Sequence, residues 1–159
     1  MNALPILIRD YEQSEIPILL AVIRAAFSEY EGKLDPPSSA ERKTVEIVRQ
    51  ELEKAQAIVA ESDSEIIGCV FYQTKPEGVY LDRLSVLPEH RKGGVGTELI
   101  KEVQSRAQNQ GQKALLLSVR LSLEKQQAYY KKLGFEFDSY GTHSGYDEPT
   151  YMNMKKMLE

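Results

Sequence analysis

Three glycines and two cations lie close together between residues 91 and 97. The run Arg91-Lys92-Gly93-Gly94-Val95-Gly96-Thr97 follows an apolar segment that ends at Pro88, and a helical pattern begins at Gly94. The N–H groups and the positive dipole end of a helix start attract anions. Glycine lets a phosphate approach the backbone closely, and Arg91 and Lys92 add positive charge. The run therefore predicts a phosphate-binding turn between a strand and a helix.

Two other glycine-rich site types fit this run poorly. A dinucleotide-binding turn has the pattern G-x-G-x-x-G, and Leu99 stands where its third glycine belongs. A P-loop has a lysine directly after its second glycine, and Gly96 is followed by Thr97. A plain tight turn entering a helix is the remaining alternative. The coincidence of charge, glycine spacing and strand-to-helix context favours the phosphate site over it.

The hydrophobic pattern predicts the order β-α-α-β-β-β-α-β-α-β-β. The expected strands are 4–9, 57–60, 66–73, 79–87, 114–119, 135–140 and 150–154. The expected helices begin after Ser14 and after Ser38 or Ser39, and span 94–109 and 123–133. Short turns between residues 57 and 87 predict an antiparallel meander. The strand-helix-strand portion from 79 to 119 needs a crossover and predicts a parallel pair.

Two motifs carry a resemblance to a known family. Residues 91–96 match the R/Q-x-x-G-x-G/A signature of GNAT acetyltransferases, and residues 84–88 look like the strand that precedes it. Residues 130–135, Tyr-Lys-Lys-Leu-Gly-Phe, resemble the family's Y-x-K-L-G-F segment. The resemblance implies an α/β fold in one domain over residues 1–159. Its central sheet would be mixed, mostly antiparallel and seven-stranded, with about four flanking helices.

The resemblance implies acetyl-CoA as cosubstrate, held where the fourth and fifth strands separate. Backbone groups of Leu84, Ser85 and Val86 would bind the pantetheine arm. Backbone N–H groups from Lys92 to Thr97 would hold the pyrophosphate, helped by Arg91. The sequence departs from the family at one place, because Leu123 stands where relatives often have an asparagine that contacts CoA. That departure leaves the pyrophosphate loop untouched.

Tyr130 occupies the position of the family's frequent general acid. Attack of an amine on a thioester expels a thiolate, and a phenol with a pKa of about 10 is matched to protonate it. The alternative is a tyrosine that packs under the cofactor. The neighbouring Tyr129 would point about 100° away on a helix and is expected in the core.

The acceptor amine also needs a base, and two residues are candidates. Asp82 shares strand parity with Leu84 and Val86, although a salt bridge or an edge position would explain it as well. His143, between the last two strands, titrates near neutrality and is the second candidate, for a base or a substrate contact. Tyr146 would line the acceptor pocket with Asp147 and Glu148, whose charges would favour a cationic amine. Plain surface residues are the alternative for this loop.

These features predict an enzyme that transfers acetyl directly to a primary amine of a small molecule or peptide. Cys69 lies in an apolar run and is expected to be a buried hydrophobe, so no covalent nucleophile is expected. A non-catalytic acyl-CoA sensor and a transferase for another acyl group remain open alternatives. A homodimer is common among members of the family.

Composition narrows the partners further. The net charge of −4 argues against a nucleic-acid partner. The two histidines, His90 and His143, lack the spacing of a metal-ligand pair, so no metal is expected. No apolar stretch approaches the roughly 18 residues that span a bilayer, and no basic, apolar leader opens the sequence. No membrane partner and a cytoplasmic location are therefore expected.

Overall fold

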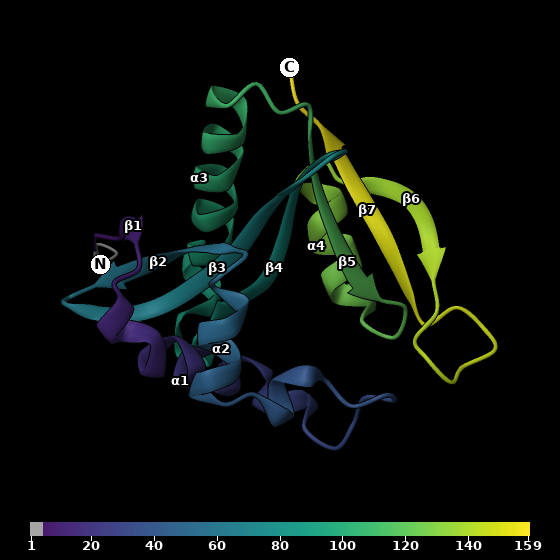
Figure 1. Cartoon of the computed structure of the whole chain (residues 1–159), viewed down its shortest axis with the longest axis horizontal. Helices are drawn as coiled ribbons and strands as arrows, with labels where there is room; N and C mark the ends of the chain where they lie inside the picture. Colours follow the sequence, from purple (N-terminus) through teal and green to yellow (C-terminus); the bar gives the residue numbers. More distant parts are fainter. Residues whose placement is uncertain (1–4) are drawn as a thin grey trace. The chain divides into compact units, whose positions relative to one another are not determined.

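The computed structural model describes residues 5–159 and has the predicted order of helices and strands (Figure 1). The strands are β1 (Leu7–Asp10), β2 (Gln56–Ser62), β3 (Glu65–Lys75), β4 (Gly78–Val86), β5 (Ala114–Arg120), β6 (Glu136–Gly141) and β7 (Tyr151–Met157). The α-helices are α1 (Ile16–Phe27), α2 (Val45–Glu51), α3 (Val95–Asn109) and α4 (Glu124–Lys132). Short 3₁₀ helices are η1 (Gln13–Glu15), η2 (Ser28–Tyr30), η3 (Ser39–Arg42) and η4 (Pro88–Gly93). The predicted first strand starts at Leu4, which lies outside the described residues.

The strands form one seven-stranded sheet in the order β1-β2-β3-β4-β5-β7-β6. Strands β1, β2 and β3 pair antiparallel, as do β5, β7 and β6. Strands β4 and β5 pair in parallel, with Val79 opposite Leu115 and Tyr80 opposite Leu116. The predicted mixed sheet and its crossover pair are therefore confirmed. None of the helices within residues 5–159 is long and apolar enough to cross a membrane.

The described residues divide into two compact units, and each has its own apolar packing. The first contains the residues up to Gln73 together with Arg83–Val103. In it the apolar side of α1 packs with residues of α2, β2 and β3. The buried residues of α1 recur every three or four positions, which is the helical period: Ile16, Leu19, Leu20, Val22, Ile23 and Ala26.

Strand β3 separates the two helical layers of this first unit. Cys69 belongs to the cluster with α1 and α2, so its neighbour Gly68 points to the opposite face. A Cβ at Gly68 would lie 3.0 Å from Val95 Cγ1 and 3.3 Å from Leu99 Cδ1. Glycine at position 68 therefore permits the close approach of α3 to the sheet, which places the start of that helix.

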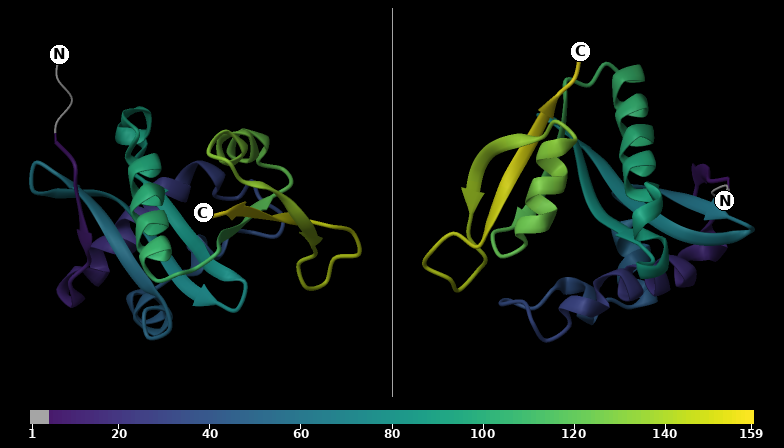
Figure 2. Two further views of the ribbon diagram at one scale, coloured as in Figure 1. Left: turned by 90° about the horizontal axis from the view of Figure 1, so that it is seen from above. Right: turned by 180° about the vertical axis from the view of Figure 1, so that it is seen from behind.

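The second unit contains Thr74–Asp82 and Gln104–Glu159. Strands β5, β7 and β6 lie side by side in it, with α4 alongside (Figure 2). Along β5 the buried side chains alternate, at Leu115, Leu117 and Val119. Leu117 is opposite Met154 and Val119 is opposite Met152 on β7, and both methionines are buried. On the other face of β5, Leu116, Ser118 and Arg120 are half-buried and Ala114 is buried.

The starts of two helices differ from the sequence prediction. Ser14 lies inside η1, where Glu12 and Glu15 form a capping box, so Ser14 does not cap α1. The N-cap of α2 is Thr44, whose hydroxyl oxygen accepts the Ile47 N–H at 3.2 Å. Ser38 caps η3 instead. Serine and threonine cap both kinds of helix, so the sequence pattern does not distinguish one 3₁₀ turn from the start of an α-helix.

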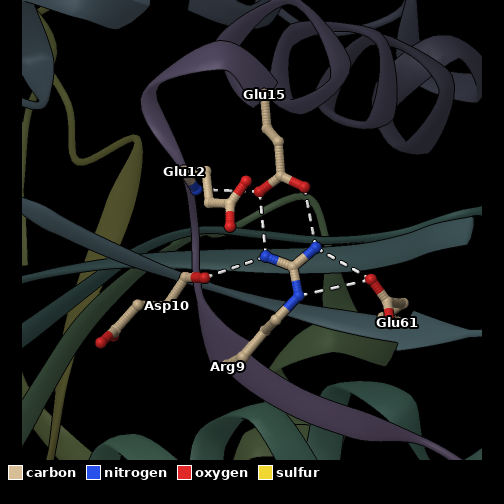
Figure 3. Close-up of polar contacts among 5 residues, drawn as sticks. All are labelled: Arg9, Asp10, Glu12, Glu15 and Glu61. Carbon is tan, nitrogen blue, oxygen red and sulfur yellow. Dashed lines mark hydrogen bonds and ion pairs between the residues drawn. The ribbon is translucent and has the colours of Figure 1, made fainter. Parts of the chain in front are cut away.

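A partly buried ion cluster joins β1, η1 and β2 (Figure 3). Arg9 on β1 donates to both carboxylate oxygens of Glu15, at 3.0 and 2.7 Å, and to Glu61 on β2, at 3.3 and 2.9 Å. Glu15 also accepts the N–H of Glu12 at 2.8 Å. The hydrogen bond from Arg9 lowers the pKa of Glu15. The cluster therefore fixes η1, and with it the start of α1, against β1 and β2.

We expect Arg9→Met to lower the free energy of unfolding by about 1–2 kcal/mol at pH 7, because it breaks a bidentate, charge-assisted contact. The folded-state pKa of Glu15 is below the unfolded value of about 4.3. The contribution of Glu15 is therefore complete above pH 5 and is lost as the pH falls through the folded-state pKa. Urea unfolding of both proteins between pH 3 and pH 7 measures this difference.

Arg49→Met is the matched control for this prediction. Within residues 5–159, Arg49 forms an ion pair with Glu46 three residues away, and both side chains are at least half exposed. Such a pair contributes at most about 0.5 kcal/mol. Equal destabilisation by the two substitutions, or a loss for Arg9→Met that stays constant down to pH 3, would contradict the role of the Arg9 cluster.

Candidate active site

The predicted phosphate loop is a 3₁₀ helix, a left-handed glycine and the start of α3 in direct succession. Helix η4 ends at Gly93, and Gly94 follows with a φ of +77°. The N–H of Glu98 donates to Gly94 O at 3.0 Å, so α3 begins at Val95, one residue later than predicted. The N–H groups of Val95 and Gly96 precede that bond, where an α-helix offers no carbonyl of its own to them. The turn is therefore a helix start of the kind that binds anions.

Neither Gly93 nor Gly94 is explained by packing. Among residues 5–159, nothing lies within 4 Å of a Cβ built at either position. Gly94 has a conformational reason, because its positive φ favours glycine. Gly93 has no such φ and is exposed. The loop thus presents bare backbone with open space beside it, which is what close contact with a phosphate requires.

Arg91, the first residue of the loop signature, points toward the end of α1. Its guanidinium forms an ion pair with Glu29 and donates a second hydrogen bond to Ala26 O. Both partners belong to the same compact unit as the loop. The guanidinium therefore joins the loop to the segment after α1. A contact of Arg91 with pyrophosphate stays a prediction.

The end of β4 contains the residues expected at the pantetheine arm. Leu84 and Val86 are half-buried, whereas Ser85 is buried and its hydroxyl donates to Arg83 O at 3.1 Å. Arg83 has a φ of +56°, which is rare for a non-glycine residue in a strand. Regular strand geometry is interrupted at Arg83, and a shared orientation of Asp82 with Leu84 and Val86 stays a prediction. Asp82 itself is exposed.

The prediction for Cys69 is confirmed, since the side chain is fully buried on β3. Burial raises the pKa of its thiol to about 12, and a hydrogen bond with Ser85 offsets this only in part. A thiol with such a pKa remains protonated at neutral pH. Cys69 therefore does not supply a nucleophilic thiolate.

Tyr130 lies near the end of α4, with its ring 5.9 Å from the ring of Phe135, edge to face. Phe135 is buried, and its N–H donates to Tyr130 O at 3.0 Å. Between them Gly134 has a φ of +102°, which ends the helix. The tyrosine is thus held by a backbone bond and an aromatic contact in one turn of chain. Tyr129 is half-buried like Tyr130, so its predicted place in the core is not confirmed.

The structure brings His143 and Tyr146 together in the loop between β6 and β7. Their rings are 6.5 Å apart, and the Tyr146 N–H donates to His143 O at 3.1 Å. The hydroxyl oxygen of Thr150 lies 2.8 Å from His143 N and 2.5 Å from His143 Nδ1. Burial, and secondarily the charge of Arg120, lower the pKa of His143. The contacts with Thr150 therefore orient the imidazole, and the lowered pKa favours its neutral form.

Two neighbours of His143, Tyr151 and Arg120, were not predicted from the sequence. The ring of Tyr151 is 5.1 Å from that of His143. Arg120, at the end of β5, is directly opposite Tyr151 in the strand register. The position of Arg120 at the end of a strand could have indicated a site residue, because residues at strand ends commonly line sites in α/β proteins. Its pairing with Tyr151 depends on a register between distant strands.

Comparisons with known proteins agree with the loop and the fold. The profile of the Acetyltransferase (GNAT) family matches residues 20–135. An amino-acid acetyltransferase of Pseudomonas fluorescens (strain Pf0-1) is 32% identical over 123 residues, which are 72% of this chain. The matched segment spans only 27% of the length of that relative.

Solved structures share the fold over nearly the whole chain. The PaiA N-acetyltransferase of Thermoplasma acidophilum, solved in complex with coenzyme A, has a TM-score of 0.79 at 22% identity and covers 97% of this chain and 99% of its own. The ribosomal-protein-S18-alanine N-acetyltransferase of Escherichia coli has a TM-score of 0.74 at 18% identity, covering 96% and 94%. The family profile covers most of the chain, and the signature residues of the family form the start of a helix in this structure. This protein therefore belongs to the GNAT family of acetyltransferases.

Proposed function

We propose that the protein transfers acetyl from acetyl-CoA directly to a primary amine. The observation that carries this proposal is the left-handed turn at Gly94 directly before the N-terminus of α3, with open space beside Gly93 and Gly94. A similar fold was solved with coenzyme A bound, and the curated relative is named an amino-acid acetyltransferase. Both support the assignment of cosubstrate and reaction class.

The loop residues fit a pyrophosphate group. Backbone N–H groups from Lys92 to Thr97 would hold it, with open space beside Gly93 and Gly94. Because the Arg91 guanidinium is bound to Glu29 and Ala26 O, we assign the phosphate contact to the backbone first. Backbone groups of residues 84–86 would bind the pantetheine arm and orient the acetyl carbonyl.

The chemical step requires two proton transfers by side chains. The acceptor nitrogen forms a bond to the acetyl carbonyl carbon, and the carbon–sulfur bond breaks. We assign Asp82 to remove the proton from the attacking amine, directly or through water, because Asp82 is exposed and adjoins the distorted position Arg83. We assign the Tyr130 hydroxyl to protonate the departing sulfur. No covalent acyl-enzyme is involved, since the Cys69 thiol is buried and protonated.

A non-catalytic acyl-CoA sensor is the alternative from another class. A thiol-release assay with acetyl-CoA and a panel of amino acids, polyamines, aminoglycosides and peptides separates the two functions. Release that depends on the amine supports the enzyme. Tight binding of coenzyme A without turnover of any amine would favour the sensor. Propionyl-CoA and succinyl-CoA in the same assay test the choice of acyl group.

The first prediction for this site concerns Gly94. Gly94→Asp should weaken coenzyme A binding by at least about tenfold relative to Gly94→Asn, because the added charge repels the pyrophosphate at a helix start. Asparagine and aspartate have nearly the same size and both tolerate a positive φ, so the pair isolates the charge. Calorimetric titration with coenzyme A measures the difference. Equal affinities of the two variants would show that the loop does not hold the pyrophosphate.

The second prediction concerns the general acid. Tyr130→Phe should reduce kcat roughly a hundredfold or more, as expected for loss of a proton donor, and should leave the affinity for coenzyme A nearly unchanged. Tyr129→Phe is the matched control, since it removes the neighbouring hydroxyl from the same turn of α4. If both variants retain full kcat, Tyr130 is not the proton donor. If Tyr130→Phe loses coenzyme A binding instead, its role is packing under the cofactor.

A further inference from the structure

One face of the second unit has a row of hydrogen-bonded polar side chains across four strands. The Tyr80 hydroxyl donates to Ser118 Oγ at 3.1 Å, and Ser118 donates to Asn153 Oδ1 at 2.7 Å. Asn153 Nδ2 then donates to Ser139 Oγ at 3.0 Å. Ser118, Asn153 and Ser139 are register partners on β5, β7 and β6. The row is a continuous hydrogen-bonded polar surface on the sheet face opposite the buried Leu117 and Val119.

The next positions along the same face are cationic and aromatic. Two residues beyond the pair Ser118 and Asn153, Arg120 on β5 is opposite Tyr151 on β7. Since alternate residues share a face, both side chains lie on the face of the polar row. The pairing continues with Leu121 N donating to Thr150 O at 3.1 Å. Arg120 and Tyr151 are both half-buried, so they are part of a partly sheltered surface.

Gly141 fixes the position of the Tyr151 ring. The two residues are register partners on β6 and β7. A Cβ at Gly141 would lie 2.2 Å from Tyr151 Cζ and 2.5 Å from its hydroxyl oxygen. The ring therefore lies across the glycine, and its other neighbour is the His143 ring at 5.1 Å. Any larger residue at 141 would move Tyr151 and the histidine that packs on it.

Thr150 contacts His143 at both its backbone nitrogen and its ring. The Thr150 hydroxyl oxygen accepts the His143 backbone N–H at 2.8 Å and lies 2.5 Å from Nδ1, and we assign the hydroxyl hydrogen to Nδ1. A neutral imidazole with Nδ1 as acceptor has its hydrogen on Nε2. Nε2 is thus a donor. This arrangement suits a contact with an anionic oxygen better than it suits a general base.

We propose that Arg120, His143 and Tyr151 form a subsite for a carboxylate on the acceptor. The inference rests on the proposed function, because it names the substrate class of that transferase. A guanidinium, an imidazole N–H and a phenol are the donor types that bind a carboxylate. Asp147 and Glu148 in the same loop are exposed, so solvent screens their charge more than that of half-buried Arg120. The acceptor is then an amine that also carries a carboxylate, as amino acids do.

The test compares free amino acids with their carboxamides as acceptors. We expect wild-type protein to favour the free acids by roughly tenfold to a hundredfold in kcat/KM, which is the range for a charge-assisted contact. Arg120→Met should raise KM for the acids to the level of the amides and leave the affinity for coenzyme A unchanged. Arg49→Met, with an exposed guanidinium in the first unit, is the matched control.

Two milder variants keep the test valid if Arg120→Met folds poorly. Tyr151→Phe removes one donor and keeps the ring, and should raise KM for the acids several-fold with kcat retained. Gly141→Ala should have a similar effect because it displaces the Tyr151 ring. A purely structural role would instead lower thermal stability and affect acids and amides equally, which would overturn the proposal.

Direct binding separates failure of the subsite from failure of the proposed function. Calorimetric titration of the complex with coenzyme A should detect the free amino acids, and Arg120→Met should abolish that binding. Equal turnover or equal binding of acids and amides by wild type would overturn the carboxylate subsite and leave the transferase intact. Binding of acids that depends on Arg120, without turnover of any amine, would support the subsite and contradict the transferase.

Discussion

The left-handed bend at Gly94 is the constraint on which the candidate site depends. A residue with a φ of +77° lets the chain leave η4 and enter α3 without an intervening loop. The first N–H groups of α3 are thereby presented beside the bare backbone of Gly93. Two features position the bend. Gly68 allows α3 to lie close to β3, and Arg91 connects the loop to Glu29 and to the last turn of α1.

The order of helices and strands was predictable because it depends on local signals. Apolar period, short turns and glycine stops all lie within a few residues of the element they define. The parallel pairing of β4 and β5 also followed, since a strand, a helix and a strand need a crossover. The signature loop was found for the same reason, as its charges and glycines are consecutive. Its helix start was misplaced by only one residue.

The features that the sequence did not reveal depend on residues that are distant along the chain. Arg91 has the charge of a phosphate ligand, but its partner Glu29 is 62 residues away in the sequence. The parity argument for Asp82 assumed regular strand geometry, which the positive φ of Arg83 interrupts. Tyr151 looks like an ordinary strand residue until the register with Gly141 and Arg120 is known. None of these three features leaves a pattern within one segment.

The local charges near the candidate site differ in sign from the net charge of the protein. The chain has a net charge of −4, which on its own suggests a preference for cationic ligands. The contacts of individual residues indicate something different. The start of α3 after Gly94 directs backbone N–H groups outward, and the pKa of His143 is lowered by burial and, secondarily, by the positive charge of Arg120. The proposed cosubstrate and the proposed acceptor carboxylate would each need such a positive region locally. By the same electrostatics, the acidic surplus elsewhere would repel an extended polyanion more than a small ligand that contacts only these regions.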